Sequence, residues 1–93
     1  MREYEYVFIV HPDLDENAFK DLIEKIKGWI TGAGGQVVKV DSWGKRKLAY
    51  PIRKQTEGQY VLVDTLMSPA FSAELERNVR FLEPILRYLV TVK

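Results

Sequence analysis

Five basic side chains fall within the eleven-residue stretch GKRKLAYPIRK, at positions 44–54: Lys45, Arg46, Lys47, Arg53 and Lys54. Lysine and arginine at this density are suited to binding phosphate groups, and the planar guanidinium of an arginine pairs with phosphate through two parallel hydrogen bonds. Leu48, Tyr50 and Ile52 lie between the two groups of basic residues and are typical of a strand, which would hold the charges in place. The stretch is therefore a candidate surface for binding a polyanion.

The net charge of +1 conceals a strong asymmetry along the chain. Residues 1–24 contain two basic and seven acidic side chains, a net charge of −5, whereas residues 39–54 contain six basic and one acidic, a net charge of +5. Such a split indicates a polyanion-binding region. A solvated edge strand, protected from aggregation by its charges, is the alternative, and composition alone does not decide between the two.

The sequence offers little that could perform catalysis or bind a metal ion. The single histidine, His11, precedes a proline and has no serine or cysteine nucleophile near it. The acidic residues Asp13, Asp15 and Glu16 are better explained by helix capping than by metal binding. There is no cysteine, so disulfides and thiolate zinc sites are excluded. We therefore expect neither an enzyme nor a cofactor.

The N-terminus has acidic residues where a signal peptide needs basic ones, and no apolar run approaches the ~20 residues of a membrane span. We therefore expect a cytoplasmic protein.

The hydrophobic periodicity predicts six elements in one domain over residues 1–93. In order, they are a strand at 4–10, a helix from Asp15 to the glycines at 32–35, strands at 36–50 and 59–67, a helix from Ser68–Pro69 to Pro84, and a strand at 85–93. The order β-α-β-β-α-β predicts an α+β, ferredoxin-like fold: a four-stranded antiparallel sheet of order 4-1-3-2 with two helices on one face. Gly44 is expected to mark a bulge in the long second strand, and residues 55–58 a polar connection.

Two helices cover only one face of such a sheet. The period of two turns one set of residues toward the helices, namely Tyr6, Phe8, Val10, Val61, Val63 and Thr65. It turns another set toward the open face, namely Val7, Ile9, Tyr60 and Leu62. Because the open face is partly apolar, we expect it to bind a protein partner, and we expect Ile9→Glu to weaken that binding without disturbing the fold. Scattered surface aliphatic residues are the alternative.

Three other functions are compatible with this fold class. Base stacking as in RNA-recognition motifs needs outward aromatic residues on the central strands, and Tyr6 and Phe8 face inward. A hydrolase of the acylphosphatase type would need an anion-binding loop after the first strand, but residues 11–15 are acidic there. A regulatory domain that self-associates through its open face stays a possible alternative.

The chain resembles, over residues 1–93, the family of the sixth protein of the bacterial small ribosomal subunit, ribosomal protein S-six. The most specific part is the motif G-x-R-x-L-A-Y-P-I-x-K, which begins at Gly44 and ends at Lys54. The remaining residues that carry the resemblance are Arg2, Tyr4, Glu5, Pro12, Leu14, Gly34 and Gly58.

This resemblance implies a structural constituent of the small ribosomal subunit, located in the cytoplasm and without catalytic activity or cofactor. It implies that the protein binds the central domain of small-subunit ribosomal RNA as a heterodimer with ribosomal protein S-eighteen. The RNA-binding residues would then include Arg2 and Arg87 besides the basic stretch, or helix residues such as Arg77 and Arg80.

Overall fold

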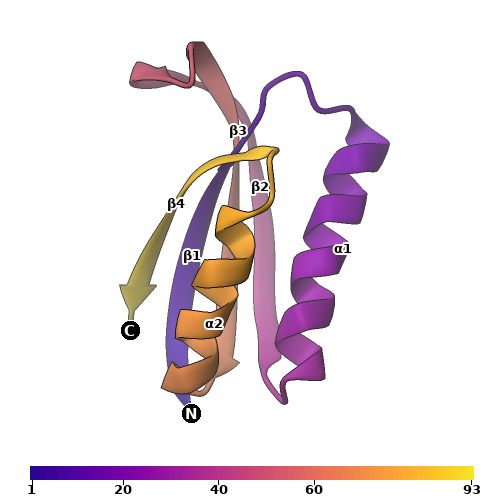
Figure 1. Cartoon of the computed structure of the whole chain (residues 1–93), viewed down its shortest axis with the longest axis vertical. Coiled ribbons are helices and arrows are strands. Elements are labelled where there is room, and N and C mark those ends of the chain that lie inside the picture. The colour runs from indigo at the N-terminus through magenta and orange to yellow at the C-terminus, as the bar shows by residue number, and fades with distance from the viewer.

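The computed structural model describes residues 1–93 and contains a single four-stranded sheet. The elements follow in the order β1 (Arg2–Val10), α1 (Glu16–Gly32), β2 (Gln36–Ile52), β3 (Gln55–Met67), α2 (Pro69–Arg80) and β4 (Ile85–Val92). The strands pair antiparallel in the spatial order β2-β3-β1-β4, and both helices lie on the same side of the sheet (Figure 1). The predicted ferredoxin-like fold and its strand order are confirmed.

Local signals in the sequence account for both helix starts and for the end of α1, whereas α2 ends at Arg80, before the predicted end at Pro84. Asp15 caps α1, because its carboxylate accepts a hydrogen bond of 2.8 Å from the Ala18 N–H. Ser68 caps α2 in the same way through the Phe71 N–H, and Pro69 occupies the first helical position. Gly34, with a φ of +85°, reverses the chain after α1. Neither helix is long and apolar enough to cross a membrane.

The core lies between the sheet and the two helices. Tyr6 and Phe8 of β1 are buried and their rings stack with centroids 5.7 Å apart. They belong to one cluster with Ile26 of α1 and with Leu75 and Val79 of α2. All six residues predicted to face the helices are at most 1% exposed, so the predicted parity of both central strands is confirmed.

The hairpin of β2 and β3 is longer than the sequence predicts. β2 runs through Pro51 to Ile52, and residues 55–58, expected as a connection, belong to β3. β2 is an edge strand, and its pairing is interrupted between Lys47 and Ile52, so no ladder hydrogen bond is needed from the proline. The far end of the hairpin projects beyond the start of β4 and bends (Figure 1, top).

Two positions give the hairpin its shape. The register shifts between Ser42 and Gly44, where Gly44 has a φ of +77°, so the predicted bulge is present. Arg53 and Lys54 form the two-residue turn with φ values of 50° and 67°. A type I′ turn needs a positive φ at both central residues, and its twist matches that of the strands. The turn therefore presents two basic side chains at the tip of the hairpin.

Substituting Gly58 tests the packing at the root of this projection. A Cβ at Gly58 would lie 2.5 Å from Cγ2 of Ile9, which is too close for any side chain. We expect Gly58→Ala to lower the free energy of unfolding by about 1–3 kcal/mol, the usual effect of overpacking. The matched control is Gly28→Ala in α1, where no atom lies within 4 Å and the change should stabilise by roughly 0.5–1 kcal/mol. Urea unfolding measures both, and a neutral Gly58→Ala would mean that Ile9 and Gly58 are not in contact.

Candidate nucleic-acid interface

The five basic residues of the central stretch lie on the projecting end of the hairpin. Lys45, Arg46 and Lys47 follow the Gly44 bulge on β2, and all five side chains are exposed. None of them forms a salt bridge within the chain. Their positive charge is therefore available to a ligand.

The register divides these charges between the two faces of the hairpin. Arg46 pairs with Gly58, and a Cβ at Gly58 would point toward Ile9 on the open side of the sheet. Lys45 and Lys47 pair with the residues on either side of Gly58, which face the opposite way. Arg46 therefore lies on the open face, and the two lysines lie on the side of the sheet that carries the helices. A nucleic acid that contacts all three must pass along the edge of the hairpin.

Trp43, whose role the sequence does not reveal, orients Arg46. The Trp43 ring stacks on Tyr60, with centroids 6.2 Å apart and an interplanar angle of 16°. The guanidinium carbon of Arg46 lies 5.8 Å from the centre of the Trp43 ring, within cation–π range. The Trp43 indole N–H donates to Oδ2 of Asp41 at 3.3 Å. This stack limits the freedom of Arg46 and sets it at the border of the open face.

Arg87 joins this surface from the opposite edge of the sheet. It lies on β4 opposite Ile9, donates a hydrogen bond to the Tyr50 hydroxyl, and has its guanidinium 5.9 Å from the centre of the Tyr50 ring. Arg2, by contrast, pairs with Met67 at the other end of β1. Arg2 and Ile9 are seven positions apart along an extended strand, about 23 Å. The structure thus brings Arg87 to the basic hairpin and leaves Arg2 apart from it.

The open face is less exposed than the sequence predicts. Ile9 is 5% and Leu62 9% exposed, and Val7 and Tyr60 are half-buried. Only Val7 and Tyr60 of these four side chains are therefore partly accessible to a partner. No helix covers them, as expected, but Leu48 and Tyr50 of the bent hairpin end line a pocket together with Ile9 and Tyr60, an effect that counting helices overlooks.

A pocket remains where the hairpin end folds back over the sheet. It has a volume of about 230 Å³ and is lined by Leu48 and Tyr50 of the hairpin together with Ile9 and Leu89 of the sheet. Tyr50 is 56% and Leu89 54% exposed, so these two side chains form its accessible rim. The buried position of Ile9 also corrects the expectation for Ile9→Glu: that change would bury a carboxylate and disturb the fold.

The other end of the open face is acidic. Nζ of Lys93 lies 3.2 Å from Glu5 and 3.3 Å from Asp64, which are neighbours on β1 and β3. Hydrogen bonds to Glu5 and then to Asp64 raise the pKa of the Lys93 amine above its usual value. The open face therefore carries opposite charges at its two ends, with the basic end at the hairpin.

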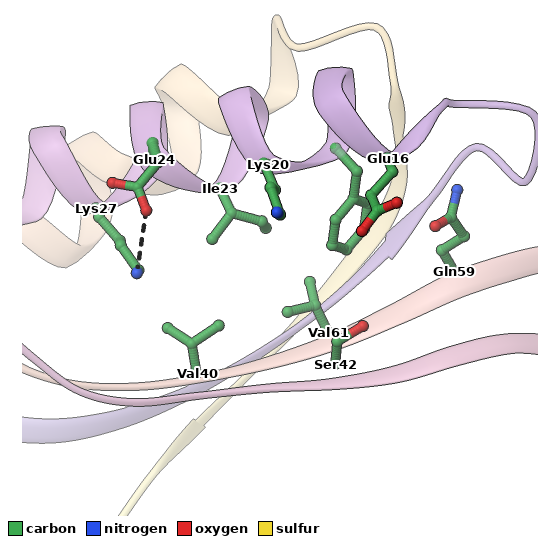
Figure 2. Close-up of a pocket in the computed structure, with 10 residues that line it drawn as sticks. Glu16, Lys20, Ile23, Glu24, Lys27, Val40, Ser42, Gln59 and Val61 are labelled. Atoms are coloured by element: carbon green, nitrogen blue, oxygen red, sulfur yellow. Dashed lines mark hydrogen bonds and ion pairs between the residues drawn. The ribbon is translucent and has the colours of Figure 1, made fainter.

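The largest cleft of the molecule lies on the other side, between α1 and β2 (Figure 2). It measures about 480 Å³, and its apolar lining includes Ile23 of α1, Val40 of β2 and Val61 of β3. Glu24 and Lys27 at its rim form an ion pair of 3.3 Å, seen as the dashed line in Figure 2. These side chains do not converge on a common point, and no three histidine or acidic side chains in the protein are grouped to hold a metal ion.

Comparison with known proteins decides the family. The family model described as Ribosomal protein S6 matches residues 3–92. The chain belongs to the ribosomal protein S6 family. The small ribosomal subunit protein bS6 of Caldanaerobacter subterraneus subsp. tengcongensis is 50% identical over 90 residues, which cover 97% of this chain and 95% of the relative. That of Moorella thermoacetica is 47% identical over 91 residues, 98% of this chain and 93% of the relative.

A solved structure agrees with this assignment. The crystal structure of 30S ribosomal protein S6 from Thermotoga maritima is similar to this chain with a TM-score of 0.92 at 32% identity, and the match covers 99% of this chain and 87% of that one. Members of the ribosomal protein S6 family are structural, non-enzymatic constituents of the small ribosomal subunit, which lies in the cytoplasm of bacteria. The family predicted from the motif at 44–54 is confirmed.

Proposed function

We propose that this S6-family protein binds the central domain of small-subunit ribosomal RNA as a heterodimer with ribosomal protein S-eighteen. The observation that carries the RNA-binding part is the projecting hairpin, whose five exposed basic side chains have no acidic partner within the chain. Uncompensated lysine and arginine side chains bind phosphates by releasing condensed counterions from the nucleic acid. The identity of the RNA domain and of the partner comes from the family resemblance.

Within this proposal, the hairpin and Arg87 make the RNA-binding surface. Arg46 and Arg87 are each held against an aromatic ring, so they meet a phosphate with less loss of side-chain freedom than a free arginine. Lys45, Lys47 and Lys54 add point charges at the edge and tip. Arg2 stays a proposed contact, and because it lies apart from the hairpin, it would touch a different part of the RNA.

The pocket beneath the hairpin end is the proposed docking site for the partner. An apolar side chain of the partner would enter between Tyr50 and Leu89, above a floor that includes Ile9 and Tyr60. Val7 and Leu62 continue this floor along the open face and stay part of the proposed surface. Because Arg87 lines the pocket, a docked partner would extend the same basic surface. The RNA would then contact both proteins at once.

Titrations of central-domain RNA with and without the partner test this function. We expect weak binding by the protein alone and tighter binding by the pair, because both proteins release counterions and the pair is prearranged. The coupling must be reciprocal, so RNA should tighten the contact between the two proteins by the same factor. Equal RNA affinities in the two titrations would contradict cooperative binding.

Leu89→Glu tests the docking surface. Leu89 is exposed, so the change should leave the fold intact while placing a charge at the rim of the pocket, and we expect weaker pairing with the partner. The matched control is Val92→Glu on the same strand, which is similarly exposed but has the opposite parity and so lies on the other face. Calorimetric titration with the partner compares the two variants. Normal pairing by Leu89→Glu would show that the partner docks elsewhere. If the unmodified protein self-associates and this variant does not, the regulatory-domain alternative would be favoured instead.

A further inference from the structure

One edge of β2 has no neighbouring strand in the sheet. β2 pairs only with β3, so part of its backbone N–H and C=O groups have no partner there. Between the two register shifts of this strand, residues 39–42 pair regularly with β3, and Val40 within this segment is 36% exposed. A regular, exposed edge of this kind can pair with a strand of another molecule.

The charged side chains of this segment have no ionic partner within the chain. Lys39 and Asp41 lie on the open face of the sheet, whereas Val40 between them points toward α1 (Figure 2). Neither charged side chain takes part in a salt bridge. Asp64, which lies next to Lys39 on β3, is bonded to Lys93 instead. One positive and one negative charge are therefore free to pair with a second molecule.

Two-fold symmetry leaves few ways for this segment to pair with a second copy of itself. A two-fold axis perpendicular to the sheet keeps each side chain on its own face, so one residue must lie opposite its own copy. Centring the axis on Lys39 or on Asp41 sets two like charges opposite each other, which is unfavourable. Centring it on Val40 sets Lys39 opposite Asp41 of the second copy on both sides of the axis. Charge therefore selects the register centred on Val40.

The helix side of the edge suits the same register. Val40 lines the cleft between α1 and β2, together with Phe19 and Ile23 of α1. In the paired strands Val40 would pack against its own copy, because the Cβ atoms of opposite residues lie about 4.5–5.5 Å apart. The two clefts would meet at this contact, which removes apolar surface of both copies from water.

β4, the strand at the other edge of the sheet, lacks this complementarity. Its one charged residue is Arg87, and Lys93 directly after it is also basic, so no pairing of β4 with its own copy sets opposite charges face to face. The basic hairpin ends do not oppose pairing through β2. Because the paired strands are antiparallel, the two hairpin ends, residues 45–54, extend beyond the paired segment in opposite directions.

We propose that the free protein forms a two-fold dimer in which residues 39–41 of β2 pair antiparallel with the same residues of a second copy. Val40 lies at the axis, and Lys39 forms an ion pair with Asp41 of the second copy on each side. The two sheets become one continuous sheet, and an edge that could otherwise start aggregation is covered. The contact is short, so the dimer is weak and depends on concentration. This inference does not rest on the proposed RNA binding.

Sedimentation equilibrium over a range of protein concentrations at low salt tests the dimer. We expect the mean mass of the unmodified protein to rise from that of one chain toward that of two. Lys39→Asp and Asp41→Lys should each raise the dissociation constant about fivefold or more, because each turns two attractive pairs into two repulsive ones. An equal mixture of the two variants should dimerise again, since each meets the opposite charges in the other. The double variant, which exchanges both charges, should also dimerise.

Two controls separate this edge from other surfaces. Lys25→Asp reverses a charge on α1 outside the cleft, and Leu89→Glu changes the open face, so both should dimerise like the unmodified protein. Urea unfolding checks that the variants are folded, including Asp41→Lys, which loses the hydrogen bond from the Trp43 indole.

Several outcomes would overturn the dimer while leaving the proposed function in place. They are a mass of one chain up to roughly 1 mM protein, a dimer that neither single charge reversal weakens, and a mixture of the two variants that stays monomeric. Loss of the dimer in Leu89→Glu would assign self-association to the open face and would also overturn it. A failure to bind RNA, by contrast, would remove the proposed function and leave the dimer standing.

Discussion

Replacing Ile26 by alanine is expected to lower the free energy of unfolding by about 2–5 kcal/mol, the usual range for deleting a large buried aliphatic side chain. Ile26 lies in the middle of α1, is buried, and belongs to the cluster that joins both helices to the sheet. Alanine would leave a cavity between layers that meet only through such side chains, and the lost contacts are not replaced by water. Urea unfolding followed by circular dichroism measures the change.

Asp21→Ala is the matched control for this prediction. Asp21 lies on the same helix, is exposed and forms no salt bridge. Its replacement should change the free energy of unfolding by no more than about 0.5 kcal/mol, as is usual for a surface site. Equal effects of the two substitutions would mean that the apolar stripe of α1 does not face the sheet.

The double variant Arg46→Ala, Lys47→Ala is expected to flatten the salt dependence of RNA binding. Two lost phosphate contacts should reduce the log–log slope by roughly 1.4–1.8, and binding should weaken alike for all RNA sequences. The fold should be unaffected, because both side chains are exposed. Fluorescence anisotropy with labelled RNA at several salt concentrations gives the slope.

The single variants add a finer test, because Arg46 and Lys47 lie on opposite faces of the hairpin. If the RNA follows only one face, the double variant loses a single contact, about 0.7–0.9 in slope, and one single variant carries that loss while the other carries none. The control removes two positive charges from α1 instead, by Lys20→Ala together with Lys25→Ala, and should leave the salt slope unchanged. An unchanged slope in the hairpin double variant, with normal partner binding, would place the RNA-binding surface elsewhere.

The parts of the fold that depend on neighbouring residues were predictable from the sequence. Asp15 and Ser68–Pro69 mark the helix starts because a cap bonds to a backbone group three residues away. The inward parity of Tyr6 and Phe8 follows from the strand period. The fold itself follows from the order of the elements and from the rule that crossovers are right-handed.

Features that depend on distant residues were not predictable in the same way. The burial of Ile9 arises from a hairpin end whose bend depends on Gly44 and on pairing beyond it. The role of Trp43 becomes clear only once Tyr60 lies beneath it. The hydrogen bond between Arg87 and Tyr50 joins strands at opposite edges of the sheet, and no sequence period connects the two residues.

Co-sedimentation with ribosomal subunits tests the central claim most directly. Tagged protein, expressed in a bacterial cell, would be followed through a sucrose gradient that separates the small and the large subunit. The proposed function predicts that the protein sediments with the small subunit at one copy per particle and dissociates from it as the salt concentration is raised. Protein that stays at the top of the gradient at low salt, or that sediments with both subunits alike, would contradict a specific place in the small subunit.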